Sequence, residues 1–235
     1  MTTSSVDGNR RIAVIVAHPD DEVLGCGGTI RRHTLAGDEV WTIILADGET
    51  SRDAAGEKAI AGREAAMQAA AKILGVQHCA THRLPDNRLD TVPLLDLIKL
   101  VERHIGDIAP AAVYTHHAGD LNVDHRRVHQ AVMTACRPQA GCSVTRLLCF
   151  ETPSSTEWQS APGEAPFVPN WFVDISDVLE TKMQALRAYG HEMKPWPHPR
   201  SYEAVEHLAR WRGATIGCAA AEAFIIGREI WRKDS

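Results

Sequence analysis

Two short apolar segments constrain the fold of this chain more than any other feature of its sequence. Residues 11–17 read RIAVIVA, and residues 40–46 read VWTIILA. Both runs are continuous and rich in β-branched residues, which is typical of parallel strands that helices cover on both faces. Between them, residues 23–36 are long enough for a helix, and Gly37 is a suitable residue to end it. The order strand, helix, strand predicts a βαβ unit.

The same alternation continues along the chain, with a Pro-rich loop expected at residues 153–169 and another at 189–200. Further strands are predicted at 76–84, 111–115, 145–150 and 171–175, and further helices at 57–74, 91–105, 124–136 and from the N-cap Ser176 to about 188. No linker divides the chain. We therefore predict a single three-layer, Rossmann-like α/β domain with a mostly parallel sheet over residues 10–235, preceded by a flexible N-terminal tail, residues 1–9.

The composition narrows the class of partner. A formal net charge of -5 and the lack of any Lys/Arg run argue against nucleic acid. No stretch approaches the roughly 20 apolar residues of a membrane span, and the polar N-terminus does not resemble a secretory signal. The six scattered cysteines form no CxxC pair and are expected to be reduced thiols. We expect a cytoplasmic protein with a small-molecule or saccharide partner; the sequence is compatible with a homo-oligomer but does not specify one.

The richest chemistry follows the first predicted strand directly. His18, Asp20, Asp21 and Glu22 fall within five residues, at the strand end where such sheets bind ligands. Carboxylates this close repel one another unless a cation neutralises them. Zinc accepts imidazole nitrogen and carboxylate oxygen, and a catalytic zinc keeps one position for water. The loop therefore predicts a zinc site.

Two structural interpretations of this loop compete with metal binding. Asp21 or Glu22 could merely cap the following helix, because acids favour helix N-termini. Gly25, Gly27 and Gly28 could also suggest a dinucleotide loop. That pattern lacks the last glycine of GxGxxG, however, and the preceding acids would repel a pyrophosphate. Metal binding is the better interpretation.

A third protein ligand has to come from elsewhere in the chain. His125 begins a predicted helix that follows the strand at 111–115, so it should lie at the same edge of the sheet. The adjacent Asp124 is expected to orient a ligand or to relay a proton. His129 would be a fourth ligand and would close the site, which suits a structural metal, so we expect it to be a packing residue.

The two segments together resemble the PIG-L/LmbE-like family, whose members remove N-acetyl groups from amino-sugar conjugates. The resemblance rests on AHPDDEVLGCGGTI at 17–30 and GDLNVDHRRVH at 119–129, and it extends from residue 11 to about 231. It implies that His18, Asp21 and His125 bind zinc and that Asp20 is the general base. Glu22 is expected either to support the metal ligands from behind or to belong to the start of the helix.

One position departs from the family pattern. Asn122 stands where other members carry a histidine that is thought to steady the oxyanion or to protonate the leaving amine. An asparagine amide can donate a hydrogen bond to an oxyanion, but it cannot act as a general acid. Asn122 is therefore a candidate catalytic residue as a donor, together with Asp124 as the relay. His116, His117 or Asp20 itself are the alternatives for the acid.

The resulting hypothesis is a hydrolysis in which zinc lowers the pKa of water towards about 7 and polarises the amide carbonyl. Asp20 removes the water proton, hydroxide attacks the acetyl carbon, and zinc with Asn122 or His117 holds the oxyanion. The substrate-binding residues predicted from the surrounding loops are Arg63, Asp86, Asn87, His117 and Trp158. Each also has an ordinary structural interpretation as a surface ion pair, a polar turn or loop packing.

Other functions use the same residues. A metal-dependent hydrolase could act on another amide or on a phosphoester, although phosphoester chemistry prefers Mg²⁺ or Mn²⁺ with oxygen ligands. A non-catalytic zinc-binding module would keep the fold without the reaction. Two histidine ligands favour zinc, and the ionisable Asp20 favours an enzyme. The sequence does not identify the N-acylated substrate.

Overall fold

The computed structural model describes residues 9–52, 56–160 and 165–231. The predicted tail, residues 1–9, lies outside these ranges except for Asn9. Within the described ranges, no helix combines the length and the apolar character that a membrane span needs.

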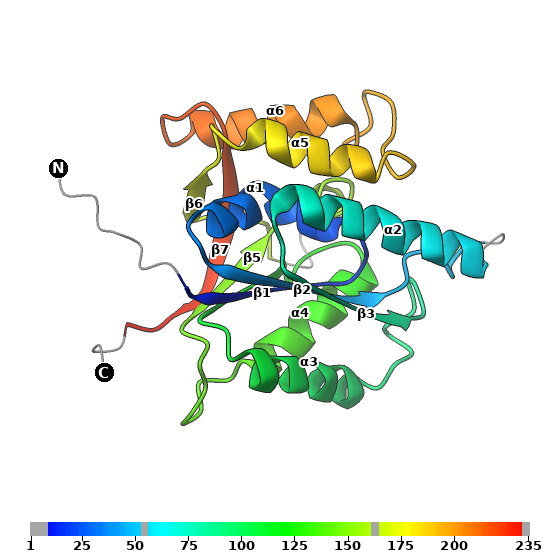
Figure 1. Cartoon of the computed structure of the whole chain (residues 1–235), viewed down its shortest axis with the longest axis vertical. Helices are drawn as coiled ribbons and strands as arrows, with labels where there is room; N and C mark the ends of the chain where they lie inside the picture. Colours follow the sequence, from blue (N-terminus) through cyan, green and yellow to red (C-terminus); the bar gives the residue numbers. More distant parts are fainter. Residues whose placement is uncertain (1–8, 53–55, 161–164, 232–235) are drawn as a thin grey trace.

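Seven strands form one sheet in the order β3-β2-β1-β4-β5-β7-β6 (Figure 1). Strands β1 to β5 are parallel, and β7 runs antiparallel to both β5 and β6. The strands are β1 (Arg11–Val16), β2 (Glu39–Ala46), β3 (His78–Leu84), β4 (Ala112–His116), β5 (Arg146–Phe150), β6 (Trp171–Asp174) and β7 (Ala221–Glu229). The helices are α1 (Asp21–Leu35), α2 (Glu57–Leu74), α3 (Leu94–Ile108), α4 (Val123–Ala135), α5 (Leu179–Ala188) and α6 (Tyr202–Ala214), with a short 3₁₀ turn, η1 (Thr156–Trp158). The predicted mostly parallel α/β domain is confirmed.

Helices cover both faces of the sheet, as the unbroken apolar strands require. Alternate residues of β1 point to opposite sides, so Ile12 and Val14 join one core with α1, α2, α5 and α6. Ala13 and Ile15 join a second core with α3 and α4. Figure 1 shows α5 and α6 stacked beyond α1 and α2 on the first face. Every residue from Ile12 to Val16 is at most 1% exposed, which explains why the strand lacks polar alternation.

The predicted boundaries differ from the structure mainly at the C-terminal end. Helix α5 begins at Leu179, and Ser176 does not cap it. The Ser176 hydroxyl instead donates to Asp174 Oδ1 at 2.5 Å, so a turn separates β6 from the helix. Helix α6 and strand β7 were not predicted.

The glycines of α1 serve close packing between helix and sheet. A Cβ at Gly25 would lie 2.2 Å from the Phe150 ring, and one at Gly28 would lie 2.7 Å from Ile175. This packing accounts for the Gly-rich segment without a bound phosphate.

The strand order creates a topological switch point beside β1. The chain continues from β1 to β2 on one side, whereas β4 lies on the other side of β1. Loops that leave neighbouring parallel strands in opposite directions open a crevice at the carboxyl edge. The loops after β1 and β4, which carry the two sequence segments singled out above, meet at this crevice.

Candidate metal centre and active site

The turn after β1 is fixed by two of its three acids. Asp21 Oδ2 accepts a hydrogen bond from the His18 backbone N–H at 2.8 Å. Glu22 Oε2 accepts one from the Asp20 N–H at 3.0 Å, and the Tyr189 hydroxyl donates to Glu22 Oε1 at 2.7 Å. Burial raises the pKa of Glu22 to about 7 against the opposing effect of the Tyr189 hydrogen bond. Glu22 therefore supports the helix start.

Asp20 is held in an unusual backbone conformation. Its φ of 113° lies in the left-handed region, which is uncommon for residues other than glycine. Asp20 occupies the N-cap position of α1, yet its side chain makes no capping hydrogen bond. The side chain is 2% exposed. The buried Asp20 carboxylate therefore takes no part in capping the helix.

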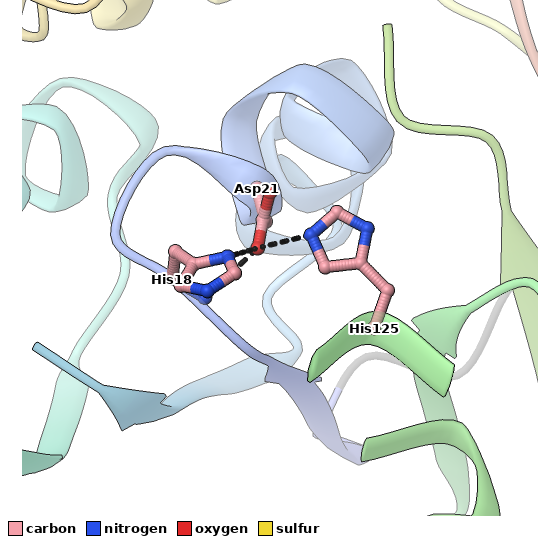
Figure 2. A group of neighbouring side chains, drawn as sticks. All are labelled: His18, Asp21 and His125. Carbon is pink, nitrogen blue, oxygen red and sulfur yellow. Dashed lines mark hydrogen bonds and ion pairs between the residues drawn. The ribbon is translucent and has the colours of Figure 1, made fainter. Parts of the chain in front are cut away.

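His18, Asp21 and His125 converge on one point (Figure 2). His18 Nδ1 lies 3.2 Å and His125 Nε2 lies 3.3 Å from the same oxygen, Asp21 Oδ2. All three side chains are buried, and Asp21 Oδ1 has no hydrogen-bond partner in the part of the chain that the structure describes. A buried carboxylate between two imidazoles, with an orphaned oxygen, fits a divalent metal.

A second group of potential ligands surrounds the other nitrogen of His18. Asp124 Oδ2 and Asp86 Oδ1 lie 3.0 and 3.1 Å from His18 Nε2. The Asp124 carboxylate, however, already accepts the backbone N–H groups of Asn87 and Leu89 at 2.7 and 2.8 Å. These acids are therefore better suited to orient His18 than to bind the metal themselves.

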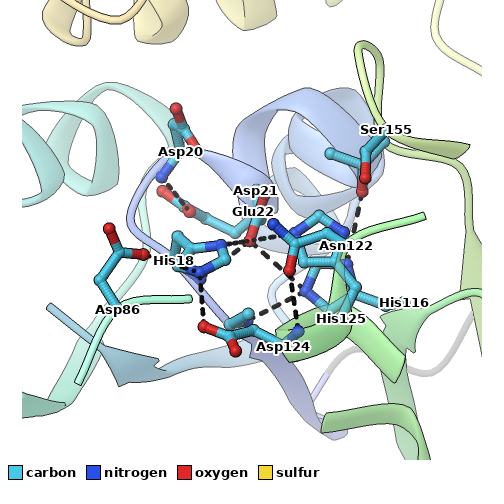
Figure 3. A network of polar contacts seen from close by, with 12 residues as sticks. His18, Asp20, Asp21, Glu22, Asp86, His116, Asn122, Asp124, His125 and Ser155 are labelled. Carbon is cyan, nitrogen blue, oxygen red and sulfur yellow. Dashed lines mark hydrogen bonds and ion pairs between the residues drawn. The ribbon is translucent and has the colours of Figure 1, made fainter. Parts of the chain in front are cut away.

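The carboxylate behind His125 is Asp120, whereas Asp124 lies behind His18. Figure 3 shows the Asp124 carboxylate directed towards His18. His125 Nδ1 is 3.1 Å from Asp120 Oδ1. Asp120 also accepts the hydroxyl groups of Ser155 and Thr156, so its own position is fixed. Each histidine of the metal group thus has its own buried carboxylate on the side away from Asp21.

The other three histidines of this region make contacts of their own, and His116 Nε2 also lies 3.4 Å from Asp21 Oδ2. His116 stacks on His125 with ring centroids 3.9 Å apart, and its Nε2 accepts the Ala17 N–H at 2.9 Å. Burial and the neighbouring His125 lower the pKa of His116 well below its ordinary range. His117 Nε2 lies 2.9 Å from the carbonyl oxygen of Ala165. His129 Nδ1 lies 2.9 Å from the His116 carbonyl oxygen, consistent with a packing role.

A polar cavity of about 190 Å³ opens beside the metal group. Among the predicted substrate-binding residues, Arg63, Asp86 and Asn87 line it, and His117 and Trp158 do not. Trp158 is 50% exposed. The residues lining the cavity are His18, Asp20, Gly48, Ser51, Arg52, Arg63, Asp86, Asn87, Asn122, His125, Ser154, Ser155, Glu192 and Arg200. Nearly all of them are polar, which suits a hydroxylated ligand.

Two arginines flank Asp20 in this cavity. Arg200 Nη1 lies 3.3 Å and Arg63 Nη2 lies 3.6 Å from Asp20 Oδ2. Asp20 Oδ1 has no hydrogen-bond partner among the described residues. Burial raises the pKa of Asp20, and the two arginines oppose that effect. The arrangement leaves one oxygen of a buried carboxylate available beside the metal group.

Asn122 caps α4 and also lines the cavity. Its Oδ1 accepts the Asp124 N–H at 2.8 Å, and its Nδ2 donates to Asn87 Oδ1 at 3.0 Å. The capping bond fixes the amide so that its Nδ2 faces the Asn87 side chain, and the second Nδ2 hydrogen is not committed by these two bonds.

Sequence reasoning missed Asp120, Glu192 and Arg200. Asp120 lies inside the segment GDLNVDHRRVH, so its position before the histidine could have identified it. Glu192 and Arg200 belong to the loop between α5 and α6 and follow no local pattern. Only the packing of this loop over the carboxyl edge brings them to Asp20.

Comparison with known proteins identifies the family of this chain. The family model described as GlcNAc-PI de-N-acetylase (PIG-L) matches residues 13–136. An uncharacterized deacetylase, YaiS, of Escherichia coli (strain K12) is 31% identical over 192 residues, which are 79% of this chain and 94% of that protein. The diacetylchitobiose deacetylase of Thermococcus kodakarensis is 28% identical over 193 residues, covering 77% and 69% of the two chains.

A solved structure supports the fold. The N,N'-diacetylchitobiose deacetylase from Pyrococcus horikoshii superposes with a TM-score of 0.75 at 23% identity, covering 92% of this chain and 83% of the other. The family match spans the β1 loop and the start of α4, and hence both halves of the metal group. This chain belongs to the PIG-L family of de-N-acetylases.

Proposed function

We propose that this protein hydrolyses the N-acetyl, or a related N-acyl, group of an amino-sugar-containing small molecule or glycoconjugate. The observation that carries the proposal is the buried group His18, Asp21 and His125 beside the unengaged Asp20 oxygen, in a polar cavity of about 190 Å³. Relatives named as deacetylases of acetylated amino sugars support the substrate class.

Zinc is the metal that we propose for His18, Asp21 and His125. Two imidazole nitrogens and one carboxylate oxygen suit zinc better than magnesium, which prefers oxygen ligands. When bound, zinc polarises the amide carbonyl and lowers the pKa of water.

The roles of the chain's own residues follow from their positions. Asp20 accepts the proton of the attacking water at its unengaged oxygen and later returns it to the departing amine nitrogen. Asp120 and Asp124 hold His125 and His18 in their orientations. Asn122 offers an amide N–H to the carbonyl oxygen, and Arg63, Asp86 and Asn87 offer groups to the sugar hydroxyls.

The test is acetate release from a panel of N-acetylated sugars by the zinc-loaded full chain. The panel should include free N-acetylglucosamine, its disaccharide and several glycosides. We expect release from at least one member, stoichiometric zinc by elemental analysis, and loss of activity after chelation with recovery on adding zinc. Zinc binding without acetate release from any N-acyl sugar would contradict the proposed reaction and leave a hydrolase of another bond or a metal-binding module.

A further inference from the structure

Three arginines line the cavity, and they differ in how many carboxylates surround them. Arg63 is 3% exposed and lies within ion-pair distance of Glu49 and Glu192 as well as Asp20. Arg52 pairs with Glu49 and Glu192 at the more exposed mouth. Two or more carboxylates therefore lie within ion-pair distance of each of these two guanidinium groups.

Arg200 is the exception. Its Nη1 lies 3.3 Å from Asp20 Oδ2, and its Nε donates to Ser154 Oγ at 3.0 Å. Within residues 9–52, 56–160 and 165–231, no hydrogen bond or ion pair uses its Nη2. Its side chain is 20% exposed, so the group reaches the cavity. Two nitrogens thus fix the guanidinium plane while the third remains available to a ligand.

We propose that Arg200 is a catalytic residue that donates a hydrogen bond from Nη2 to the acyl oxygen as that oxygen becomes an oxyanion. The inference rests on the proposed deacetylation. Preorganised donors directed at a developing charge are among the strongest catalytic contributions, and arginine keeps its charge throughout.

The movement of negative charge during the reaction explains why the position of Arg200 beside Asp20 is suitable. Water gives a proton to the Asp20 carboxylate, the water oxygen bonds to the acyl carbon, and the carbonyl π pair moves onto the carbonyl oxygen. One negative charge therefore leaves Asp20 and appears on the oxyanion. The carbonyl then re-forms as the C–N bond breaks, the proton passes from Asp20 to nitrogen, and amine and acetic acid result, which exchange a proton to give ammonium and acetate. A guanidinium beside Asp20 stays close to the charge in both states.

The other donors of the region are less well placed for this role. Asn122 lines the cavity but is a neutral donor. His116 and His117 direct ring nitrogens to Ala17 and to the Ala165 carbonyl. Arg63 Nε also lacks a hydrogen-bond partner among the described residues, but this nitrogen is buried, and Arg63 has Glu49 and Glu192 within ion-pair distance. Arg200 is the arginine at Asp20 that has no second carboxylate within ion-pair distance in the described ranges.

The kinetic test compares Arg200→Met, Arg200→Lys and Arg200→Ala on the best substrate of the panel. We expect Arg200→Met to lower kcat about 10²–10³-fold with KM changed only a few-fold, and Arg200→Lys to keep part of the rate. Guanidinium ion should partly restore Arg200→Ala. The matched control is Arg187→Met, which removes an exposed arginine that pairs with Glu180, and it should match the wild type. An unchanged kcat in Arg200→Met would overturn the proposal.

A binding test separates contact with the oxyanion from an effect through Asp20. Methylphosphonate, a tetrahedral anion, is titrated calorimetrically into zinc-loaded wild type, Arg200→Met, Asp20→Asn and the double variant. We expect Arg200→Met to weaken binding at least about tenfold in both backgrounds, the loss of one charge-assisted hydrogen bond. No loss in the Asp20→Asn background would show that Arg200 only positions Asp20, which overturns the proposal. Because this measurement needs no turnover, it stands even if no sugar of the panel is hydrolysed.

Discussion

Two equally buried carboxylates contact α1 and are used in opposite ways. Asp20, before the helix, and Glu222, on β7, are 2% and 4% exposed. Glu222 accepts the N–H groups of Gly28 and Thr29 at 2.9 and 2.7 Å and the Lys182 ammonium at 2.6 Å. Asp20 has two arginines at longer distances and one oxygen without a partner among the described residues.

Burial alone therefore does not identify a functional acid. A fully satisfied buried carboxylate has nothing left to offer a substrate, and removing it leaves a buried cation uncompensated. A buried carboxylate with an unused oxygen keeps a proton-accepting site. The substitutions below test this distinction, beginning with the largest expected effect.

Asp20→Asn should abolish most of the activity and leave the fold intact. Loss of a general base costs about 10²–10⁴ in rate, and asparagine tolerates a positive φ. The measurement is kcat on the best panel substrate, alongside zinc content and circular dichroism. Near-normal turnover with zinc bound would exclude Asp20 as the base.

Glu222→Ala should lower the free energy of unfolding. It leaves the Lys182 ammonium, 3% exposed, without its anion, at a cost of about 3–5 kcal/mol in the free energy of unfolding. Urea denaturation measures the loss. The double change with Lys182→Met should recover the part of the loss that comes from the uncompensated charge, whereas the Gly28 and Thr29 N–H groups stay unpaired. A double variant as unstable as the single one would show that the Lys182 charge is not the cause.

Asp120→Asn should weaken zinc binding, because Asp120 orients His125. Loss of a carboxylate behind a metal-binding histidine typically costs 10–100-fold in affinity. Competition with a chromogenic chelator gives the dissociation constant, and the exposed Asp96→Asn on α3 serves as the control. Equal zinc affinities for the two variants would remove Asp120 from the metal centre.

A third buried acid, Asp38, contributes to stability in a way that depends on pH. Burial would raise the pKa of Asp38, but bonds from His33 and Arg10 hold it well below its ordinary value. Because the folded pKa lies below the unfolded value of about 3.9, this stabilisation is present above that pH and is lost as the pH falls below it.

Asp38→Asn should therefore cost about 1.5 kcal/mol near pH 6, and the difference from the wild type should shrink towards pH 3. Unfolding free energies across this range provide the check. A difference that stays constant with pH would mean that the charge of Asp38 contributes nothing.

Trp158→Ala should have the smallest effect. The ring is half-exposed, packs edge-on against His198 and does not line the polar cavity. We expect kcat/KM to change less than about threefold, as for most surface substitutions. A loss beyond tenfold on a glycoside substrate would restore Trp158 as a sugar contact.

The parallel half of the sheet could be predicted from the sequence because its patterns are local. Strands β1 and β2 are continuous apolar runs, and Gly37 follows the helix that it was expected to end. Strand β7 was missed because its first residues, Ala221-Glu222-Ala223, favour strands weakly, and pairing with β5 and β6 decides their conformation. Its antiparallel direction has no local signal.

The candidate site was likewise predictable only for the residues that follow local patterns. His18, Asp20 and Asp21 share one loop, and the carboxyl-edge rule for parallel sheets placed His125 beside them. Arg200 reaches Asp20 only because a long loop folds back across the edge, and no spacing rule anticipates a contact over 180 residues. The zinc identity, the substrate, the oligomeric state and the cytoplasmic location stay predictions.

The backbone at Asp20 has a consequence for engineering. A non-glycine residue at φ 113° carries a conformational cost of about 1–3 kcal/mol. Glycine at this position would relieve that cost and lose the carboxylate. Selection for thermal tolerance alone would therefore favour glycine at position 20 and yield inactive protein. A library screened only for soluble yield would enrich the same substitution.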